Sequence, residues 1–206
     1  MEPIKRTIED YDQIAEEYCK KTEEEGDREF HERMLDRTLN FLPSEPRVID
    51  LGCGDGRDTE YMRKKGVDVV GIDLSGSMID LARKKYPESA FIQADMRDTV
   101  FPDDSFHGAW ASASLINIPK SEFSRVEKEV YRIVEPEGIF AFSFKEGDRE
   151  GFEESVVEGH ERYYSYYTLD EIEDELNLFD MVKSERCPKK IFGSDFIYCW
   201  ARGKKR

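Results

Sequence analysis

The sequence has little histidine, no excess of basic residues and no long apolar run. Its 206 residues include three His, and 31 Lys and Arg stand against 46 Asp and Glu, which gives a formal net charge of −15 at pH 7. Nonspecific affinity for nucleic acid comes from clustered Lys and Arg, so a nucleic-acid partner is not expected. Nowhere do about 18 apolar residues stand together, and the N-terminus has no apolar signal segment. We therefore expect no membrane span and no signal peptide.

The four cysteines lack the spacing of a metal site. Cys19, Cys53, Cys187 and Cys199 include no C-x-x-C pair, and their separations match no zinc pattern. Cys53 falls within a glycine-rich turn, where a disulfide would be difficult to form. We therefore expect reduced cysteines, no bound metal and a cytoplasmic location.

The length suits one α/β domain over residues 1–206. Apolar residues at helical spacing predict two helices, over 4–25 and 28–40, that form an N-terminal helical cap within 1–42. Strands and helices then alternate through a cofactor-binding core, 43–145. The expected strands are 48–51, 67–72, 90–93, 106–111 and 139–144, and the expected helices are 58–65, 75–86 and 121–134. This alternation predicts βαβ units and a parallel sheet covered on both faces.

The last third, 146–206, has a different pattern and is interpreted as a substrate-side cap with closing strands. Residues 146–159 are polar and are expected to form a loop or cap. A helix over 168–176 is expected to begin with a capping Thr168, since Glu171 follows three residues later. Residues 181–185 and 196–201 are predicted to be two strands.

The strongest motif is a glycine-rich turn after the first expected strand. Gly52, Gly54 and Gly56 let the chain turn sharply and let a ligand lie against the main chain. A dinucleotide fingerprint, G-x-G-x-x-G, would need its third glycine where this chain has Arg57. Asp50 precedes the turn and suits an ammonium group better than a diphosphate. The motif therefore favours S-adenosylmethionine, which carries an ammonium and a sulfonium group and no phosphate.

Two further acids follow the next two expected strands. Asp73 ends the strand over 67–72 and is suited to accept hydrogen bonds from both hydroxyls of a ribose. Asp95 follows the strand over 90–93 and is suited to an adenine amino group. Together with the glycine turn, these two loops describe a pocket for a cofactor that contains adenosine.

From about residue 47 to 144 the sequence resembles the class I S-adenosylmethionine-dependent methyltransferase family. Five motifs carry the resemblance in order, at 48–56 (Val-Ile-Asp-Leu-Gly-Cys-Gly-Asp-Gly), 71–75, 93–96, 106–112 and 135–140. The resemblance implies a Rossmann-like three-layer sandwich whose seven-stranded, mostly parallel sheet has an antiparallel last strand. The segment 11–18 also resembles the helix that caps the cofactor in members that act on small molecules.

The resemblance also implies a set of residues that bind the cofactor. They are Tyr11, Tyr18, Asp50, Gly52, Cys53, Gly54, Asp73, Leu74, Met78, Asp95, Met96, Ala111 and Ser112. Some have other interpretations: Asp73 could cap the following helix, although Ser75 suits that position better, and Met78, Tyr11 and Tyr18 could be ordinary core residues.

The methyl acceptor is not identified by the sequence. Candidate acceptor residues are Trp110, Ser114, His160, Arg162 and Tyr164. The tyrosine-rich run 159–167 fits either a substrate rim, with His160 as a base and Arg162 as an anion clamp, or a strand packed on the core, which we favour. The isolated His31 and His107 are expected on the surface.

We therefore predict a methyltransferase that uses S-adenosylmethionine, with a small metabolite as the leading acceptor and a protein side chain as the second. The fourth motif lacks the Asn-Pro-Pro-aromatic run that resembles amino-group methylation of adenine or glutamine. No catalytic residue is assigned, because the transfer needs a general base only if the acceptor must lose a proton. Two alternatives stay open: a regulatory protein that binds the cofactor without turnover, and a nicotinamide-dependent oxidoreductase, which the glycine spacing disfavours.

Overall fold

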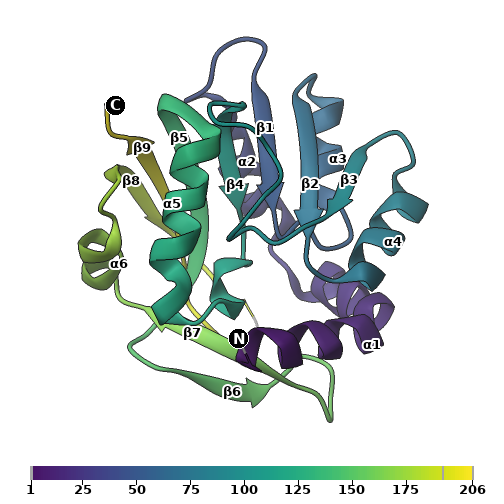
Figure 1. Ribbon diagram of the computed structural model, residues 1–206. Helices are drawn as coiled ribbons and strands as arrows, with labels where there is room; N and C mark the ends of the chain where they lie inside the picture. Colours follow the sequence, from purple (N-terminus) through teal and green to yellow (C-terminus); the bar gives the residue numbers. More distant parts are fainter. Residues whose placement is uncertain (1, 192, 206) are drawn as a thin grey trace.

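A computed structural model of the protein describes residues 2–191 and 193–205 (Figure 1). The helices are α1 (Glu2–Glu25), α2 (Arg28–Leu39), α3 (Arg57–Lys64), α4 (Gly76–Lys85), α5 (Phe123–Ile133) and α6 (Leu169–Glu175), with short 3-10 turns at Leu115–Asn117 and Lys120–Glu122. The strands are β1 (Arg47–Leu51), β2 (Asp68–Asp73), β3 (Ala90–Gln93), β4 (Phe106–Ala111), β5 (Val134–Glu146), β6 (Glu150–Glu154), β7 (Glu161–Tyr167), β8 (Phe179–Arg186) and β9 (Phe196–Gly203).

The described residues form a nine-stranded sheet that contains the expected seven-stranded arrangement. The strands β3, β2, β1, β4 and β5 lie side by side in this order, and each is parallel to its neighbour. The last strand, β9, runs antiparallel between β5 and β8. The prediction of a mostly parallel sheet with an antiparallel last strand is therefore confirmed.

The sheet lies between two layers of helices because successive side chains of a strand point to opposite faces. In β9, Cys199 belongs to the apolar core that includes residues of α5 and α6, whereas Trp200 belongs to the core that includes residues of α2 and α3. In β1, Ile49 belongs to the core with α5 and α6, and Val48 belongs to the core with α2 and α3. Figure 1 shows α5 in front of the sheet and α2 and α3 behind it.

Two of the expected helix starts depend on side-chain caps that the sequence predicts. Ser75 Oγ accepts a hydrogen bond from Met78 N at 3.1 Å and begins α4. Thr168 and Glu171 form a capping box at the start of α6, in which each side chain accepts from the other residue's backbone N–H. Both satisfy backbone donors that have no partner within the first helical turn.

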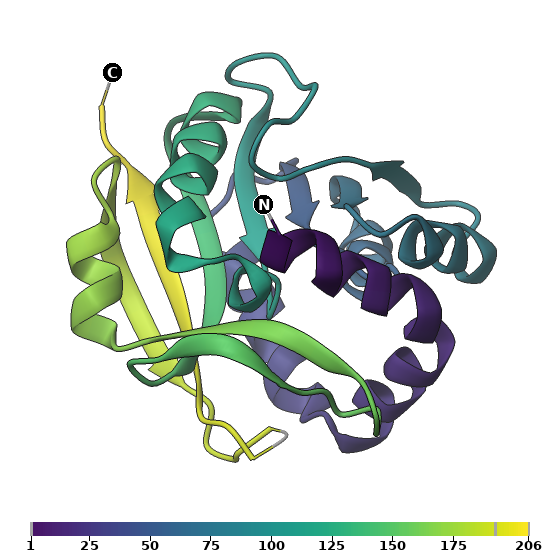
Figure 2. The same ribbon diagram turned by 60° about the horizontal axis from the view of Figure 1, so that its bottom comes forward.

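An antiparallel hairpin of β6 and β7 extends beyond the expected seven strands. The prediction of a loop or cap over 146–159 is wrong at Glu150–Glu154, which is β6. This strand has no buried face, so its sequence lacks the alternation of apolar and polar residues that indicates a strand. The end of β7 pairs in parallel with the end of β5, and α1 lies beside the hairpin (Figure 2).

Helix α1 is held against the domain by polar contacts with α4 on one side and with β7 on the other. Asp12 Oδ1 accepts from Ser75 Oγ at 2.6 Å and from Ser77 N at 3.1 Å, at the start of α4. On the other side, Thr7 Oγ1 accepts from Tyr163 N of β7 at 3.1 Å. These contacts place α1 across the carboxyl ends of the parallel strands.

Candidate functional site

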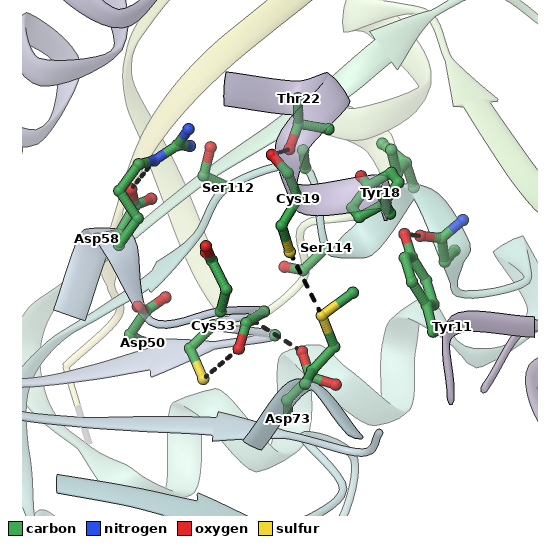
Figure 3. Close-up of a pocket in the computed structure, with 18 of the residues that line it drawn as sticks. Tyr11, Tyr18, Cys19, Thr22, Asp50, Cys53, Asp58, Asp73, Ser112 and Ser114 are labelled. Carbon is green, nitrogen blue, oxygen red and sulfur yellow. Dashed lines mark hydrogen bonds and ion pairs between the residues drawn. The ribbon is translucent and has the colours of Figure 1, made fainter. Parts of the chain in front are cut away.

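A cavity of about 370 Å³ lies where the parallel strands end, between the sheet and α1. Open α/β sheets bind ligands at this edge, because the loops after neighbouring strands converge there. Figure 3 shows Asp50, Cys53 and Asp73 on the strand side of the cavity, and Tyr18, Cys19 and Thr22 on α1.

Most of the predicted cofactor residues line this cavity. Those that do are Tyr11, Tyr18, Asp50, Gly52, Cys53, Gly54, Asp73, Leu74, Met78, Asp95, Met96 and Ser112. Ala111 is fully buried within β4 and does not line it. The predicted residues come from α1, from the ends of β1 and β2, from the glycine turn, from α4 and from the loops after β2, β3 and β4, so the fold brings distant motifs together.

The glycine turn adopts a backbone that favours glycine. Gly52 and Gly54 have φ of 71° and 54°, and the N–H groups of Gly52 and Cys53 donate to Ile72 O at 2.8 and 2.9 Å. A Cβ on Gly52 would stand 2.4 Å from Ser114 Cβ, whereas a Cβ on Gly54 would meet nothing within 4 Å. The turn is therefore tightly packed at Gly52 and open at Gly54, so a ligand can lie directly against the main chain there.

Asp73 lies at the end of β2 beside this turn. One oxygen of its carboxylate accepts from Gly54 N at 3.0 Å and the other from Ser75 N at 2.9 Å. Burial raises the pKa of Asp73 above its ordinary value. Because a carboxylate has about four acceptor positions, both oxygens can accept further hydrogen bonds from a ligand.

Asp95 is held by an arginine that the sequence did not single out. Arg97 Nε and NH2 donate to the two Asp95 oxygens at 3.0 and 2.7 Å, and Arg97 NH1 donates to Glu122 at 2.8 Å. Burial acts to raise the pKa of Asp95, but the hydrogen bonds from Arg97 outweigh it and hold this pKa below the ordinary value. Arg97 thus fixes the position of an ionised carboxylate at the cavity wall.

A second acidic pair lies beneath the glycine turn. Asp50 accepts a hydrogen bond from Thr59 Oγ1 at 2.6 Å, and burial together with the nearby Asp58 charge raises the pKa of Asp50. Asp58 accepts from Trp110 Nε1 at 2.8 Å. Burial acts to raise the pKa of Asp58, but His31, Arg57 and Trp110 together lower it. The two carboxylates therefore have opposite pKa shifts in one buried network.

The prediction that His31 is a surface residue is wrong. Its side chain is 13% exposed, lines the cavity and lies with Nε2 2.8 Å from Asp58 and Nδ1 2.9 Å from the Tyr198 hydroxyl. The residue sits next to the apolar face of α2, and only the packing of α2 against β9 and α3 brings its partners close. His107, by contrast, is half-buried, and its Nδ1 accepts from Arg47 N at 2.8 Å.

The candidate acceptor residues divide into two groups. Ser114, Arg162 and Tyr164 line the cavity, and Ser114 Oγ is buried without a hydrogen-bond partner among the described residues. Trp110 is fully buried in the core, and His160 lies outside the cavity with Nδ1 2.6 Å from Asp10.

The favoured interpretation of 159–167 as a strand is confirmed by β7, which buries Tyr164, Tyr166 and Tyr167. The same strand also places Arg162 at the cavity wall, whereas His160, the base of the alternative interpretation, does not line the cavity. Lys145, near the end of β5, lines the cavity as well, and the sequence analysis did not find it.

Residues 2–191 and 193–205 show neither a metal site nor a membrane-spanning helix. In this part of the chain no group of three or more His, Cys, Asp or Glu side chains is arranged to hold a metal ion. The four cysteines are free and buried. None of the described helices combines the length and apolar character needed to cross a membrane.

Comparisons with known proteins agree with this geometry. Residues 48–138 match the family model described as "Methyltransferase domain". YqeM of Bacillus subtilis (strain 168), which is named as a methyltransferase, is 36% identical over 106 residues, 49% of this chain and 43% of its own. The chain spans about half the length of the curated relatives it matches.

Two solved structures show the same fold. A methyltransferase of Methanosarcina mazei that depends on S-adenosylmethionine has a TM-score of 0.74 and 20% identity, covering 81% of this chain and 96% of that one. The 1,6-didemethyltoxoflavin N1-methyltransferase of Burkholderia thailandensis, solved with S-adenosylhomocysteine and 1,6-didemethyltoxoflavin, has a TM-score of 0.66 and 20% identity, covering 93% and 88%.

The described residues have the Rossmann-like fold of these solved structures. Residues 48–138 are similar to the methyltransferase-domain family, and this matched region holds the glycine turn, Asp73 and Asp95.

Proposed function

We propose that this protein transfers a methyl group from S-adenosylmethionine to a small-molecule acceptor. The observation that carries the proposal is the open glycine turn beside Asp73, where exposed main chain and a half-buried carboxylate face one cavity. The side chains at this site suit the cofactor, since carboxylates can bind its ammonium, sulfonium and hydroxyl groups. Among the described residues, the turn carries no cluster of basic side chains that would bind a diphosphate.

Each part of the cofactor has a proposed place on the chain. The methionine part lies against Gly52, Cys53 and Gly54, with Asp50 on the side of its amino group. The ribose hydroxyls bind Asp73, whose two oxygens are fixed by Gly54 N and Ser75 N. This fixed carboxylate needs little reorganisation when it accepts a ligand's hydrogen bonds.

The adenine end is proposed to lie between α4 and the loop after β3. Leu74 and Met78 supply apolar contacts there, and Met78 is fixed by a 3.8 Å contact from Cys19 Sγ on α1. Asp95 accepts from the adenine amino group while Arg97 holds it in place. Met96, beside it, contributes its backbone N–H.

When bound, the cofactor supplies a methyl group on a sulfonium, which an acceptor atom attacks in line. The chain contributes alignment and exclusion of water, because the N-terminal helix covers the cavity. Tyr11 and Tyr18 of this helix line the cavity in an edge-to-face pair, with ring centroids 5.1 Å apart. Their rings are proposed to face the cationic sulfur, which aromatic faces attract.

The same observations weigh against the two alternatives. A nicotinamide-dependent oxidoreductase would need to place a diphosphate at the turn, where the carboxyl groups of Asp50, Asp58 and Asp73 line the cavity. A regulatory protein without turnover needs no acceptor space, whereas this cavity continues past the cofactor residues to Ser114, Lys145 and Arg162.

We also propose a cytoplasmic location and no nucleic-acid partner. The four free, buried cysteines and the net charge of −15 support this.

Calorimetry with S-adenosylmethionine and S-adenosylhomocysteine, and with NAD as the control, tests the proposal. We expect binding of both adenosyl ligands and no response to NAD. Folded protein that binds neither adenosyl ligand would overturn the proposed function.

A further inference from the structure

The end of the cavity away from the glycine turn carries positive charge inside a group of tyrosine rings. Arg162 on β7 is 1% exposed, and its guanidinium carbon lies 4.4 Å from the ring centroid of Tyr11 and 4.3 Å from that of Tyr18. Lys145 on β5 is 7% exposed, and its Nζ lies 3.8 Å from the ring centroid of Tyr164. Both cations line the cavity.

The Arg162 guanidinium is only partly satisfied by the protein. Its NH2 donates to the Tyr164 hydroxyl at 2.9 Å, but Nε and NH1 are buried without a hydrogen-bond partner among the described residues. The nearest carboxylate is that of Asp10, whose Oδ2 lies 3.9 Å from Arg162 Nε, beyond hydrogen-bond distance. A buried guanidinium with two unused donors is costly unless a ligand completes its hydrogen bonds.

Lys145 adds a second charge that no described carboxylate neutralises directly. The nearby Glu153 is already engaged, since its two oxygens accept from Arg149 and from the Tyr166 hydroxyl. Asp10 is likewise shared with His160. This end of the cavity therefore holds two buried cations against one partly used carboxylate.

We propose that the methyl acceptor carries a carboxylate, which Arg162 and Lys145 bind at the tyrosine-lined end of the cavity. The guanidinium has unused N–H groups at Nε and at NH1, either of which can donate to a carboxylate, and Lys145 adds a point charge. A monoanion balances the local excess of one positive charge, whereas a phosphate dianion would exceed it. The rings of Tyr11, Tyr18 and Tyr164 suit an apolar or aromatic body on the same molecule.

This inference rests on the proposed function, because it assigns the acceptor part of the same cavity. The cofactor also has a carboxylate, and it is the other possible occupant of this site. Arg57 directly follows the glycine turn and lines the cavity at the methionine end, so it is the nearer cation for the cofactor's carboxylate. Arg162 and Lys145 are therefore assigned to the acceptor.

The test is a calorimetric titration of two carboxylates, benzoate and pentanoate, into protein saturated with S-adenosylhomocysteine. Benzamide and pentanamide serve as neutral analogues, and phenyl phosphate as the dianion. We expect at least one carboxylate to bind about tenfold or more tightly than its amide and than phenyl phosphate. Binding of neither carboxylate, or equal binding of carboxylate and amide, would overturn the inference.

Two cavity variants and one matched control locate the binding. Arg162→Met and Lys145→Met should each weaken carboxylate binding by about tenfold or more and leave the Kd of S-adenosylhomocysteine within about twofold. As the control, Lys65→Met removes a lysine whose Nζ lies 5.1 Å from the Tyr61 ring centroid outside the cavity, and it should change neither Kd. Thermal unfolding of each variant checks that it is folded.

The outcomes separate this inference from the proposed function. If the two cavity variants lose S-adenosylhomocysteine together with the carboxylate, or if the two ligands compete, the cations hold the cofactor and the inference fails. If phenyl phosphate binds more tightly than the carboxylates, the site takes a dianion and the inference also fails. If the folded wild-type protein does not bind S-adenosylhomocysteine at all, the proposed function itself fails.

Discussion

The two ends of the cavity differ in charge and in how completely the protein satisfies its own polar groups. At the glycine-turn end, Asp73 and Asp95 are held by backbone N–H groups and by Arg97, so their carboxylates are fixed before any ligand arrives. At the tyrosine end, Arg162 has two donors without partners among the described residues, and Lys145 faces an aromatic ring. Carboxylates that the protein already holds in place suit a cofactor that binds in every catalytic cycle. The unused donors of Arg162, in contrast, indicate that an anionic group of the acceptor completes their hydrogen bonds.

The largest effect is expected at the acidic end, from Asp58→Ala. This change leaves Trp110 Nε1 and His31 without their buried acceptor and should lower the free energy of unfolding by about 3 kcal/mol. Asp98→Ala is the matched control, because that carboxylate is 79% exposed and lies 3.5 Å from a surface arginine, Arg125. Urea denaturation of both variants measures the difference. Equal stabilities would show that Asp58 does not hold this end together.

The next effect concerns the ribose. Asp73→Ala should weaken binding of S-adenosylhomocysteine by roughly 1–3 kcal/mol, since the ribose hydroxyls lose their buried acceptor. Asp80→Ala, an exposed carboxylate on the adjacent α4, should leave the affinity unchanged. Calorimetry gives both values, and a wild-type Kd in the Asp73 variant would remove the ribose assignment.

A pH dependence is expected at the cationic end. Burial lowers the pKa of Lys145 to about 8, with smaller contributions from Glu153, which raises it, and from Arg162 and Arg149, which lower it. The ammonium is therefore charged below that pH and loses its charge above it. Carboxylate affinity should fall by up to about tenfold between about pH 7 and about pH 9, and Lys145→Arg should remove most of this change because arginine stays charged.

An affinity that does not change over this range in the wild-type protein would contradict a role for Lys145 in holding the carboxylate. Binding of benzoate at each pH, to protein loaded with S-adenosylhomocysteine, is the measurement.

The smallest effect is expected where the two ends meet. Tyr11→Phe keeps the ring beneath Arg162 but removes the hydroxyl that donates to Asn117 Oδ1 at 3.0 Å. We expect the free energy of unfolding to fall by about 1 kcal/mol and carboxylate affinity to change by less than about twofold. A large loss of carboxylate affinity, measured by calorimetry, would mean that the hydroxyl and not the ring matters at this position.

The glycine-turn end could be predicted from sequence because its parts are local. Gly52 and Gly54 follow β1 directly, and Asp73 and Asp95 follow the next two strands, so the parallel sheet alone brings them to one edge. The parallel sheet covered on both faces follows from the same alternation of elements, whereas the antiparallel last strand is implied by the resemblance to the methyltransferase family.

The tyrosine end could not be predicted as fully, because it depends on contacts between distant segments. Lys145 meets Tyr164 only after the β6–β7 hairpin forms, and the polar sequence of β6 hides that strand. His31 and Asp58 lie 27 residues apart and meet through the packing of α2. Arg162 was found as a candidate, but its stacking on α1 required the position of that helix.

The most direct test of the two-ended cavity is a crystal structure of the protein with S-adenosylhomocysteine and benzoate together. The account predicts homocysteine against Gly52 and Gly54, ribose hydroxyls on Asp73, and the benzoate carboxylate on Arg162 and Lys145. A ribose away from Asp73, or the homocysteine carboxylate on Arg162, would contradict it.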